Sequence, residues 1–352
     1  MKDIKPNCIK IGEVEGTDLI ELSVSRLKTW RRCQVKHDFK YVDKLRPKRK
    51  AVPLRRGSWV HSCLEARNEG KNWVDVIKQL KADEYDKLFA EEKAELGDLP
   101  TEVFRIMRAY HQTYAKVDLV YETIAAEQQF MIRLGKTPFV LTGVIDRIMR
   151  NKTNGQIWCQ EYKTMKRLPS EDYRLSDIQT TVYVQVLQYL APYLGYNPKD
   201  VMGVIIDYIC TKPPTIPDVL KSGELSRRKI FCDRWTYLAC LKREGLDPAD
   251  YEDFLERLDE NKFFYRIPMT RSKDMLNNVF KELLITGQQI KNFSGKMVSR
   301  SLDWTCDRPK CEYRDLCLAQ FQGLDTNFLI ESQFTKGGEE VNGKEVEDES
   351  DD

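Results

Sequence analysis

Three charged residues near the middle of the chain have the types and spacing of a metal-dependent phosphodiesterase site. Asp146 interrupts an apolar segment, and a buried carboxylate is costly unless a cation or hydrogen bonds compensate it. Glu161 and Lys163 stand two residues apart, so on a strand both project from one face. Two carboxylates on neighbouring strands can bind Mg²⁺ or Mn²⁺, while a lysine orients or deprotonates a water molecule for attack on phosphorus. A structural ion pair between Asp146 and Lys163, with Glu161 incidental, explains the same residues without catalysis.

A β-hairpin is the element that would bring these groups together. Residues 139–149 and 156–163 are rich in β-branched and aromatic residues. Asn154 and Gly155 lie between them, and Asn-Gly between two apolar segments is typical of a tight hairpin turn. The hairpin places the aspartate of the first strand close to the Glu-x-Lys pair of the second.

The flanking segments are predicted to be mainly helical. Residues 23–42 are expected to form one helix that Ser23 or Ser25 caps. Gly57 opens a second helix, which runs to about Glu69.

Further helices are expected between residues 73 and 117. After the hairpin we expect a helix over residues 176–194 and a buried strand over residues 201–211. The chain from there to about residue 294 is predicted to be mostly helical.

The composition is that of a globular protein, for which we expect a cytoplasmic location. The chain has 352 residues, of which 41% are hydrophobic and 32% are charged. This length suits one large domain or two small ones. No apolar run approaches the roughly 18 residues that span a bilayer, so no membrane association is expected. The N-terminus lacks the apolar core of a signal peptide.

The net charge is unevenly distributed along the chain. Residues 338–352 hold eight acidic residues and one lysine, a composition that predicts a disordered acidic tail. The tail carries −7, which leaves +9 for the other residues, since the whole chain carries +2. A basic body suits a polyanionic partner such as DNA. The basic loop over residues 44–50, with Arg55 and Arg56, is either a solvated loop or a phosphate-contact surface.

Three of the ten cysteines are closely spaced near the C-terminus. The others mostly stand singly in apolar stretches, where a reduced thiol behaves as a small hydrophobic residue. Short loop-like segments separate Cys306, Cys311 and Cys317, and three thiolates this close can converge on one metal centre. A fourth ligand is then needed. In a reducing compartment such a cluster binds metal more often than it forms a disulfide.

Five short motifs resemble, in order, those of the RecB-like nucleases of the PD-(D/E)XK class, which include phage exonucleases and CRISPR-adaptation nucleases. They are Leu22-Ser23-Val24-Ser25-Arg26-Leu27, Gly57-Ser58-Trp59-Val60-His61-Ser62-Cys63-Leu64-Glu65, Gly143-Val144-Ile145-Asp146-Arg147, Glu161-Tyr162-Lys163-Thr164 and Gln179-Thr180-Thr181-Val182-Tyr183. The third motif lacks the proline before Asp146 that names the class. The resemblance covers residues from about 20 to 212 and the C-terminal cysteine segment.

The resemblance implies a restriction-endonuclease-like α/β fold, in which a mixed β-sheet flanked by helices carries helical insertions. It also implies roles for seven residues: His61, Asp146, Glu161 and the backbone carbonyl of Tyr162 as metal ligands, Lys163 as the catalytic lysine, and Gln179 and Tyr183 as residues that position DNA or that lysine. The last two lie four residues apart, so they share one helical face. His37 and His111 match no motif and are expected at the surface.

The resemblance further implies a four-iron, four-sulfur cluster, with Cys33 as the fourth ligand beside Cys306, Cys311 and Cys317. Structural zinc is the alternative, although zinc sites favour paired cysteine knuckles rather than one remote cysteine and a triplet. The cluster would tie the first helix to the C-terminal segment as a staple around the nuclease core.

These features predict a nuclease domain over residues 1–337, followed by the tail. Its core spans residues from about 20 to 212 and the cysteine segment 300–320. Helical insertions are expected at about 66–125 and 213–300.

The predicted function is that of a metal-dependent DNA exonuclease for recombination or repair, in a bacterium or, if phage-encoded, in its bacterial host. No Walker motif is present, so the chain cannot power unwinding itself and acts on DNA ends or single strands. The alternatives are the nuclease subunit of a helicase or recombination complex and a non-catalytic Fe–S protein that binds DNA.

Overall fold

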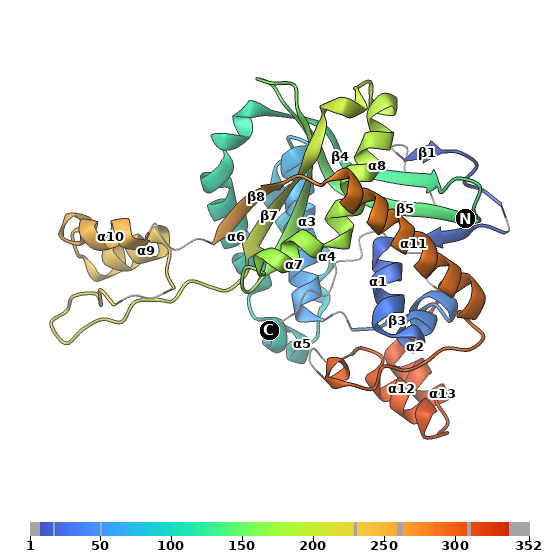
Figure 1. The fold of residues 1–352 in the computed structure, drawn as a ribbon. Helices are drawn as coiled ribbons and strands as arrows, with labels where there is room; N and C mark the ends of the chain where they lie inside the picture. The colour runs from blue at the N-terminus through green and yellow to red at the C-terminus, as the bar shows by residue number, and fades with distance from the viewer. Residues whose placement is uncertain are drawn as a thin grey trace.

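A mixed β-sheet with helices on both faces forms the centre of the protein (Figure 1). The computed structural model describes residues 8–16, 18–49, 51–228, 231–258, 263–307 and 311–337. The strands follow the order β1 (Ile9–Ile11), β4 (Tyr121–Arg133), β5 (Phe139–Asn151), β6 (Ile157–Met165), β7 (Val201–Cys210) and β8 (Phe264–Met269), and β2 (Ile20–Leu22) also pairs with β5. The β1–β4, β2–β5 and β6–β7 pairs are parallel, and the others are antiparallel. The expected mixed α/β architecture is therefore confirmed.

The predicted hairpin is present as β5 and β6, which pair in antiparallel fashion. At its turn Gly155 has a φ of +76°, a left-handed conformation that glycine adopts without a Cβ clash. The buried strand predicted over residues 201–211 is also confirmed, as β7. Strands β1, β2, β4 and β8 were not expected from the sequence.

Helices cover the two faces of the sheet with separate apolar cores. One face is covered by α1 (Val24–Arg32), α8 (Ile178–Leu190) and α11 (Lys273–Phe293), and α7 (Glu171–Ser176) precedes α8. The other is covered by α3 (Val52–Asn68), α4 (Trp73–Asp83), α5 (Ala90–Leu96) and α6 (Leu99–Tyr114). Burying each large apolar side chain contributes about 1.5–3 kcal/mol, so both cores hold their helices firmly against the strands.

Two smaller units lie at the edges of this body. Helices α9 (Arg234–Glu244) and α10 (Glu252–Leu258) share an apolar core of their own and stand apart from the sheet in Figure 1. Near the C-terminus, β9 (Phe334–Lys336) pairs with β3 (Leu45–Pro47) beside α12 (Arg314–Phe321) and α13 (Asn327–Gln333). No helix in the described ranges is long and apolar enough to cross a membrane. The tail predicted over residues 338–352 lies outside the described residues.

The prediction of a single helix over residues 23–42 is wrong. Ser23 caps α1 as expected, because its side chain accepts a hydrogen bond from the backbone of Arg26 at 3.1 Å. The helix breaks at Cys33, whose φ of −160° and ψ of 117° are extended. Helix α2 (Gln34–His37) and a π-helical turn over Asp38–Val42 then continue the chain.

Two other local expectations also need correction. The basic segment predicted as a loop over residues 44–50 contains β3, so part of it is fixed by its pairing with β9, and Lys50 lies outside the described residues. The helix expected to open at Gly57 begins at Val52, because Pro53 fits the first turn of a helix, where its missing N–H costs nothing.

His37 is buried, with an exposed fraction of 0%, so the expectation of a surface histidine is wrong. Arg26 Nε donates to His37 Nε2 at 3.0 Å, and His37 Nδ1 lies 2.9 Å from Asp38 Oδ1. Asp38 also accepts hydrogen bonds from the Ser294 hydroxyl and the Gly295 amide. These bonds tie the segment after Cys33 to the end of α11. Burial lowers the pKa of His37 to about 4, although the hydrogen bond to Asp38 opposes the shift.

We predict that protonation of His37 destabilises the fold in mild acid. The unfolded chain binds this proton near pH 6.5, whereas the native protein resists it down to about pH 4. The contribution of neutral His37 to stability is therefore present above about pH 6.5 and is lost as the pH falls towards 4. Urea unfolding at pH 7 and pH 5 should show a larger loss for wild type than for His37→Gln. The exposed His111 provides the control, and His111→Gln should keep the wild-type pH dependence; an equal loss in all three proteins would contradict this role of His37.

A buried ionic network joins β7, β8 and the α3–α6 layer. Asp207 on β7 is fully buried and receives two hydrogen bonds from Arg266 of β8, at 2.8 and 2.6 Å. The hydroxyl of Tyr110 on α6 donates to the same carboxylate. Arg266 also pairs with Asp118, which pairs in turn with Arg67 of α3 at 2.6 Å. Each charge is compensated, so the network fixes the helical layer against the sheet.

We predict that Arg266→Met destabilises the protein by about 3–5 kcal/mol, because it leaves the buried Asp207 carboxylate without its cation. The free energy of unfolding in urea measures this loss. Arg234, which pairs with Glu252 at a more exposed position, offers the matched control. Arg234→Met should cost less than about 1 kcal/mol. Similar losses in the two variants would show that the buried network contributes no more to stability than an exposed ion pair.

Candidate active site at the fork between β5 and β6

The predicted catalytic residues lie where two strands of the sheet separate. The β5–β6 ladder runs from the Arg150–Ile157 pair to the Arg147–Gln160 pair and ends there. Only the first three residues of β5, Phe139 to Leu141, pair with β2, while β6 continues beside β7 to Met165. The sheet therefore forks next to Asp146, and backbone groups at the fork need other partners.

Asp146 occupies the fork and replaces part of the missing ladder. Its Oδ2 atom accepts a hydrogen bond from the backbone N–H of Tyr162 at 2.9 Å. Its Oδ1 atom lies 3.6 Å from Nδ1 of His61. The carboxylate is almost fully buried, so these contacts help to compensate the loss of its hydration.

Helix α3, which belongs to the layer of helices α3 to α6, supplies His61. Val60 and Leu64 of α3 are fully buried in the second core, which fixes the rotation of the helix about its axis. That rotation directs His61 towards β5 and β6, where its ring also lies edge-to-face with the ring of Tyr162 at 6.1 Å. Burial raises the pKa of the Tyr162 phenol well above its usual range, so the ring stays neutral.

Glu161, Lys163, Gln179 and Tyr183 form a second, connected group. Lys163 Nζ lies 3.4 Å from Glu161 Oε1 and donates a hydrogen bond to Gln179 Oε1. Gln179 Nε2 donates to the hydroxyl of Tyr183 at 3.2 Å. All four side chains are buried, so the amide and the hydroxyl of α8 hold the lysine in one place.

Asp177 and Lys28 support this group, and sequence reasoning missed both. Asp177 caps α8 by accepting hydrogen bonds from the backbone of Gln179 and Thr180, and it pairs with Lys28 of α1 at 3.2 Å. Burial alone would raise the pKa of Asp177, but the positive charges of Lys28 and Lys163 lower it to about 2. An aspartate directly before a helix was the available signal for the cap. Nothing in the sequence pointed to Lys28.

The donor types around Asp146 fit a hard divalent cation. Among the residues that the structure describes, no three His, Cys, Asp or Glu side chains converge closely enough to form a complete metal site. Asp146 and His61 nevertheless place an oxygen and a nitrogen donor side by side. Glu161 and the carbonyl of Tyr162 add oxygen donors from the adjoining strand, and such a set suits Mg²⁺ or Mn²⁺.

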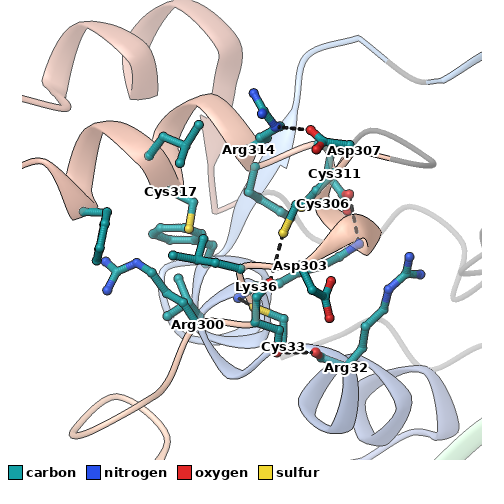
Figure 2. Close-up of a pocket in the computed structure, with 18 residues that line it drawn as sticks. Arg32, Cys33, Lys36, Arg300, Asp303, Cys306, Asp307, Cys311, Arg314 and Cys317 are labelled. Carbon is teal, nitrogen blue, oxygen red and sulfur yellow. Dashed lines mark hydrogen bonds and ion pairs between the residues drawn. The ribbon is translucent and has the colours of Figure 1, made fainter.

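Four cysteines line one cavity of about 380 Å³ between residues 32–39 and residues 300–321 (Figure 2). Cys33 comes from the break after α1. Cys306 and Cys311 come from the segment that precedes α12, and Cys317 lies within α12 itself. All four are free thiols, so the cavity holds the donor type of an Fe–S or zinc site. Without a metal, burial raises the pKa of Cys311 to about 11, which keeps that thiol protonated.

Basic side chains surround the cysteine cavity. Arg32, Lys36, Arg300 and Arg314 all line it, and Figure 2 shows them around the labelled cysteines. Lys36 pairs with Glu312 at 2.9 Å and Arg314 with Asp307 at 2.8 Å. Burial raises the pKa of the Cys317 thiol, while the interaction with Arg300 works in the opposite direction. At Cys317, therefore, the positive charge of Arg300 favours the thiolate that burial disfavours.

Comparison with known proteins identifies the family. A model of the PD-(D/E)XK nuclease superfamily matches residues 21–318. No curated protein matches the sequence. Among solved structures, the chain shares 14% identity with the crystal structure of SSO0001, over 87% of this chain and 89% of that one, at a TM-score of 0.29. That score is too low to carry an argument. Because the family match spans most of the sequence and includes every residue of the fork, the chain belongs to the PD-(D/E)XK nuclease superfamily.

Proposed function

We propose that the protein is a metal-dependent DNA nuclease that hydrolyses phosphodiester bonds from DNA ends. The observation that supports this most directly is the fork, where the Asp146 carboxylate lies between His61 and the Tyr162 amide. Nucleases of this superfamily generally use Mg²⁺ or Mn²⁺, and the donors at the fork are of the right types for these ions.

Each residue at the fork has a chemical role in this proposal. His61, Asp146, Glu161 and the Tyr162 carbonyl would hold the ion. The ion, when bound, supplies positive charge that polarises the phosphate and activates water. The Lys163 ammonium, fixed by Gln179, stabilises the negative charge that develops on phosphate oxygens. Tyr183 holds Gln179 in turn, so the lysine is oriented before DNA binds.

The preference for DNA ends rests on what the chain lacks and on its charge. The sequence has no Walker motif and so no means of opening a duplex itself. Without the acidic residues 338–352, the chain carries +9, which favours a polyanion as substrate. We therefore propose an exonuclease that acts on free ends or single strands.

We also propose that Cys33, Cys306, Cys311 and Cys317 hold a four-iron, four-sulfur cluster with a structural role. Their placement around one cavity supports this, because two distant segments contribute thiols to the same space (Figure 2). The cluster would link the break after α1 to the segment before α12. Since α1 packs against α8 and α11, this link would stabilise the layer that holds Gln179.

We predict that Lys163→Ala lowers the rate of DNA cleavage at least about 100-fold, because the developing phosphate charge loses its fixed cation. Cleavage is measured with Mn²⁺ or Mg²⁺ on end-labelled linear DNA and on closed circles. Linear DNA should be degraded by wild type while circles survive.

Lys152→Ala is the matched control for this experiment. Lys152 lies in the exposed turn of the same hairpin, so its loss should leave the rate unchanged. Cutting of closed circles at the rate of linear DNA would make the protein an endonuclease. Wild-type cleavage that survives Lys163→Ala would remove Lys163 from the chemistry.

We predict that anaerobically purified protein contains about four iron atoms per chain and that Cys306→Ala loses them together with thermal stability. Iron, sulfide and zinc analysis and thermal unfolding provide the measurements. Cys8→Ala is the control, because Cys8 lies outside the cavity and its loss should leave the iron content intact. Stoichiometric zinc in place of iron would establish the zinc alternative, and a stable, metal-free wild type would exclude both.

A further inference from the structure

Asn68 reaches the back of the candidate metal site from α3. It follows His61 by seven residues, which is close to two helical turns, so both side chains lie on the same side of the helix. Its Nδ2 atom donates a hydrogen bond to the hydroxyl of Tyr162 at 2.9 Å. One helix therefore contacts both the side chain of Asp146, through His61, and the side chain of Tyr162, through Asn68.

The Tyr162 hydroxyl continues this contact into the sheet. It donates to Oε1 of Gln160 at 3.0 Å, and the same oxygen accepts from Arg147 Nη1 at 2.9 Å. Gln160 Nε2 donates to Asp207, which belongs to the buried ionic network of β7 and β8. Gln160 and Asp207 are fully buried, so the path from Asn68 ends on groups that cannot move into solvent.

This chain of hydrogen bonds holds the immediate neighbours of the two candidate carboxylate ligands. Arg147 follows Asp146 on β5, and Glu161 lies between Gln160 and Tyr162 on β6. Neighbouring side chains on a strand point to opposite faces, so anchoring Gln160 and Tyr162 on one face sets the direction in which Glu161 points on the other. Tyr162 has a second link to the site, because its backbone N–H holds Asp146 Oδ2 at 2.9 Å.

We propose that Asn68 is a positioning residue for the metal site and that it acts through the Tyr162 hydroxyl. The bond sets the distance between α3, which carries His61, and β6, which carries Glu161 and the Tyr162 carbonyl. This inference rests on the proposed function, since it assumes that the fork binds a divalent ion. Groups that orient metal ligands from outside the ligand shell typically change metal affinity by 10–100-fold when they are removed.

Direct binding of Mn²⁺ tests the proposal without relying on catalysis. Free Mn²⁺ is measured by electron paramagnetic resonance in titrations of wild type, Asn68→Ala, Tyr162→Phe and the double variant. Each single variant should bind Mn²⁺ at least about tenfold more weakly. The double variant should be no weaker than the weaker single variant, because both substitutions remove the same bond. Cleavage of linear DNA should return towards the wild-type rate at high Mn²⁺ concentration.

Tyr237→Phe is the matched control, because it also removes a buried tyrosine hydroxyl. That hydroxyl bonds to the Ser226 carbonyl at 3.1 Å within the α9–α10 unit, away from the fork. The control should bind Mn²⁺ as wild type does, even if its unfolding temperature falls as far as that of Asn68→Ala. A change in stability alone therefore cannot produce the expected result.

The possible outcomes separate this inference from the proposed function. Wild-type Mn²⁺ affinity in Asn68→Ala and Tyr162→Phe, with wild type able to bind Mn²⁺ and cleave DNA, overturns the positioning role alone. Weakened Mn²⁺ binding in both variants, with no DNA cleavage by wild type, supports the positioning role and removes the nuclease assignment. If wild type binds no Mn²⁺, both ideas fall together.

Discussion

The hydrogen bond from the Tyr162 amide to the Asp146 carboxylate is the contact on which the candidate site depends. Where two strands of a sheet separate, their buried backbone amides and carbonyls lose their hydrogen-bond partners and need others. Here an aspartate side chain takes over where the β5–β6 ladder ends. The same bond thus completes the sheet and fixes a carboxylate, so the requirements of folding and of chemistry fall on one residue.

Because the fork opens through the sheet, both helical layers reach it. His61 arrives from α3 on one side, and Gln179 holds Lys163 from α8 on the other. The two layers are stabilised differently. The α3–α6 layer is joined to the strands by the ionic network around Asp207 and Arg266, in addition to its apolar core. The α8 layer relies on apolar packing with α1 and α11 and on the Asp177 cap.

The sequence predicted the parts of this arrangement that are local. The two segments rich in β-branched and aromatic residues and the Asn154-Gly155 turn were enough for the hairpin, since both signals lie within the hairpin itself. His61 is far from Asp146 in sequence, and only the family resemblance connected the two. Strand β4 was not predicted because its sequence is partly polar and follows a helix. It becomes a strand by pairing along the length of β5. Context outside the segment decided its conformation.

The failures at Cys33 and His37 have the same physical origin. The run of helix-compatible residues from 23 to 42 gives no sign of an extended residue in its middle. What buries His37 is a set of contacts that includes Ser294 and Gly295, which hold its partner Asp38 from the other end of the chain. No sequence pattern within residues 23–42 could indicate a hydrogen-bond partner so far away in the chain. The roles of the fork residues and of the four cysteines remain predictions for the same reason, since they concern ions that no local pattern displays.

The α9–α10 unit is, in topological terms, a very long hairpin loop. Strands β7 and β8 are antiparallel neighbours whose adjacent ends meet at the Ile209–Phe264 pair, and a turn of a few residues would suffice to connect them. The unit has its own apolar core, so its apolar side chains pack against each other and not against the sheet. Its length and surface can therefore change without disturbing the register of the strands that carry the candidate site.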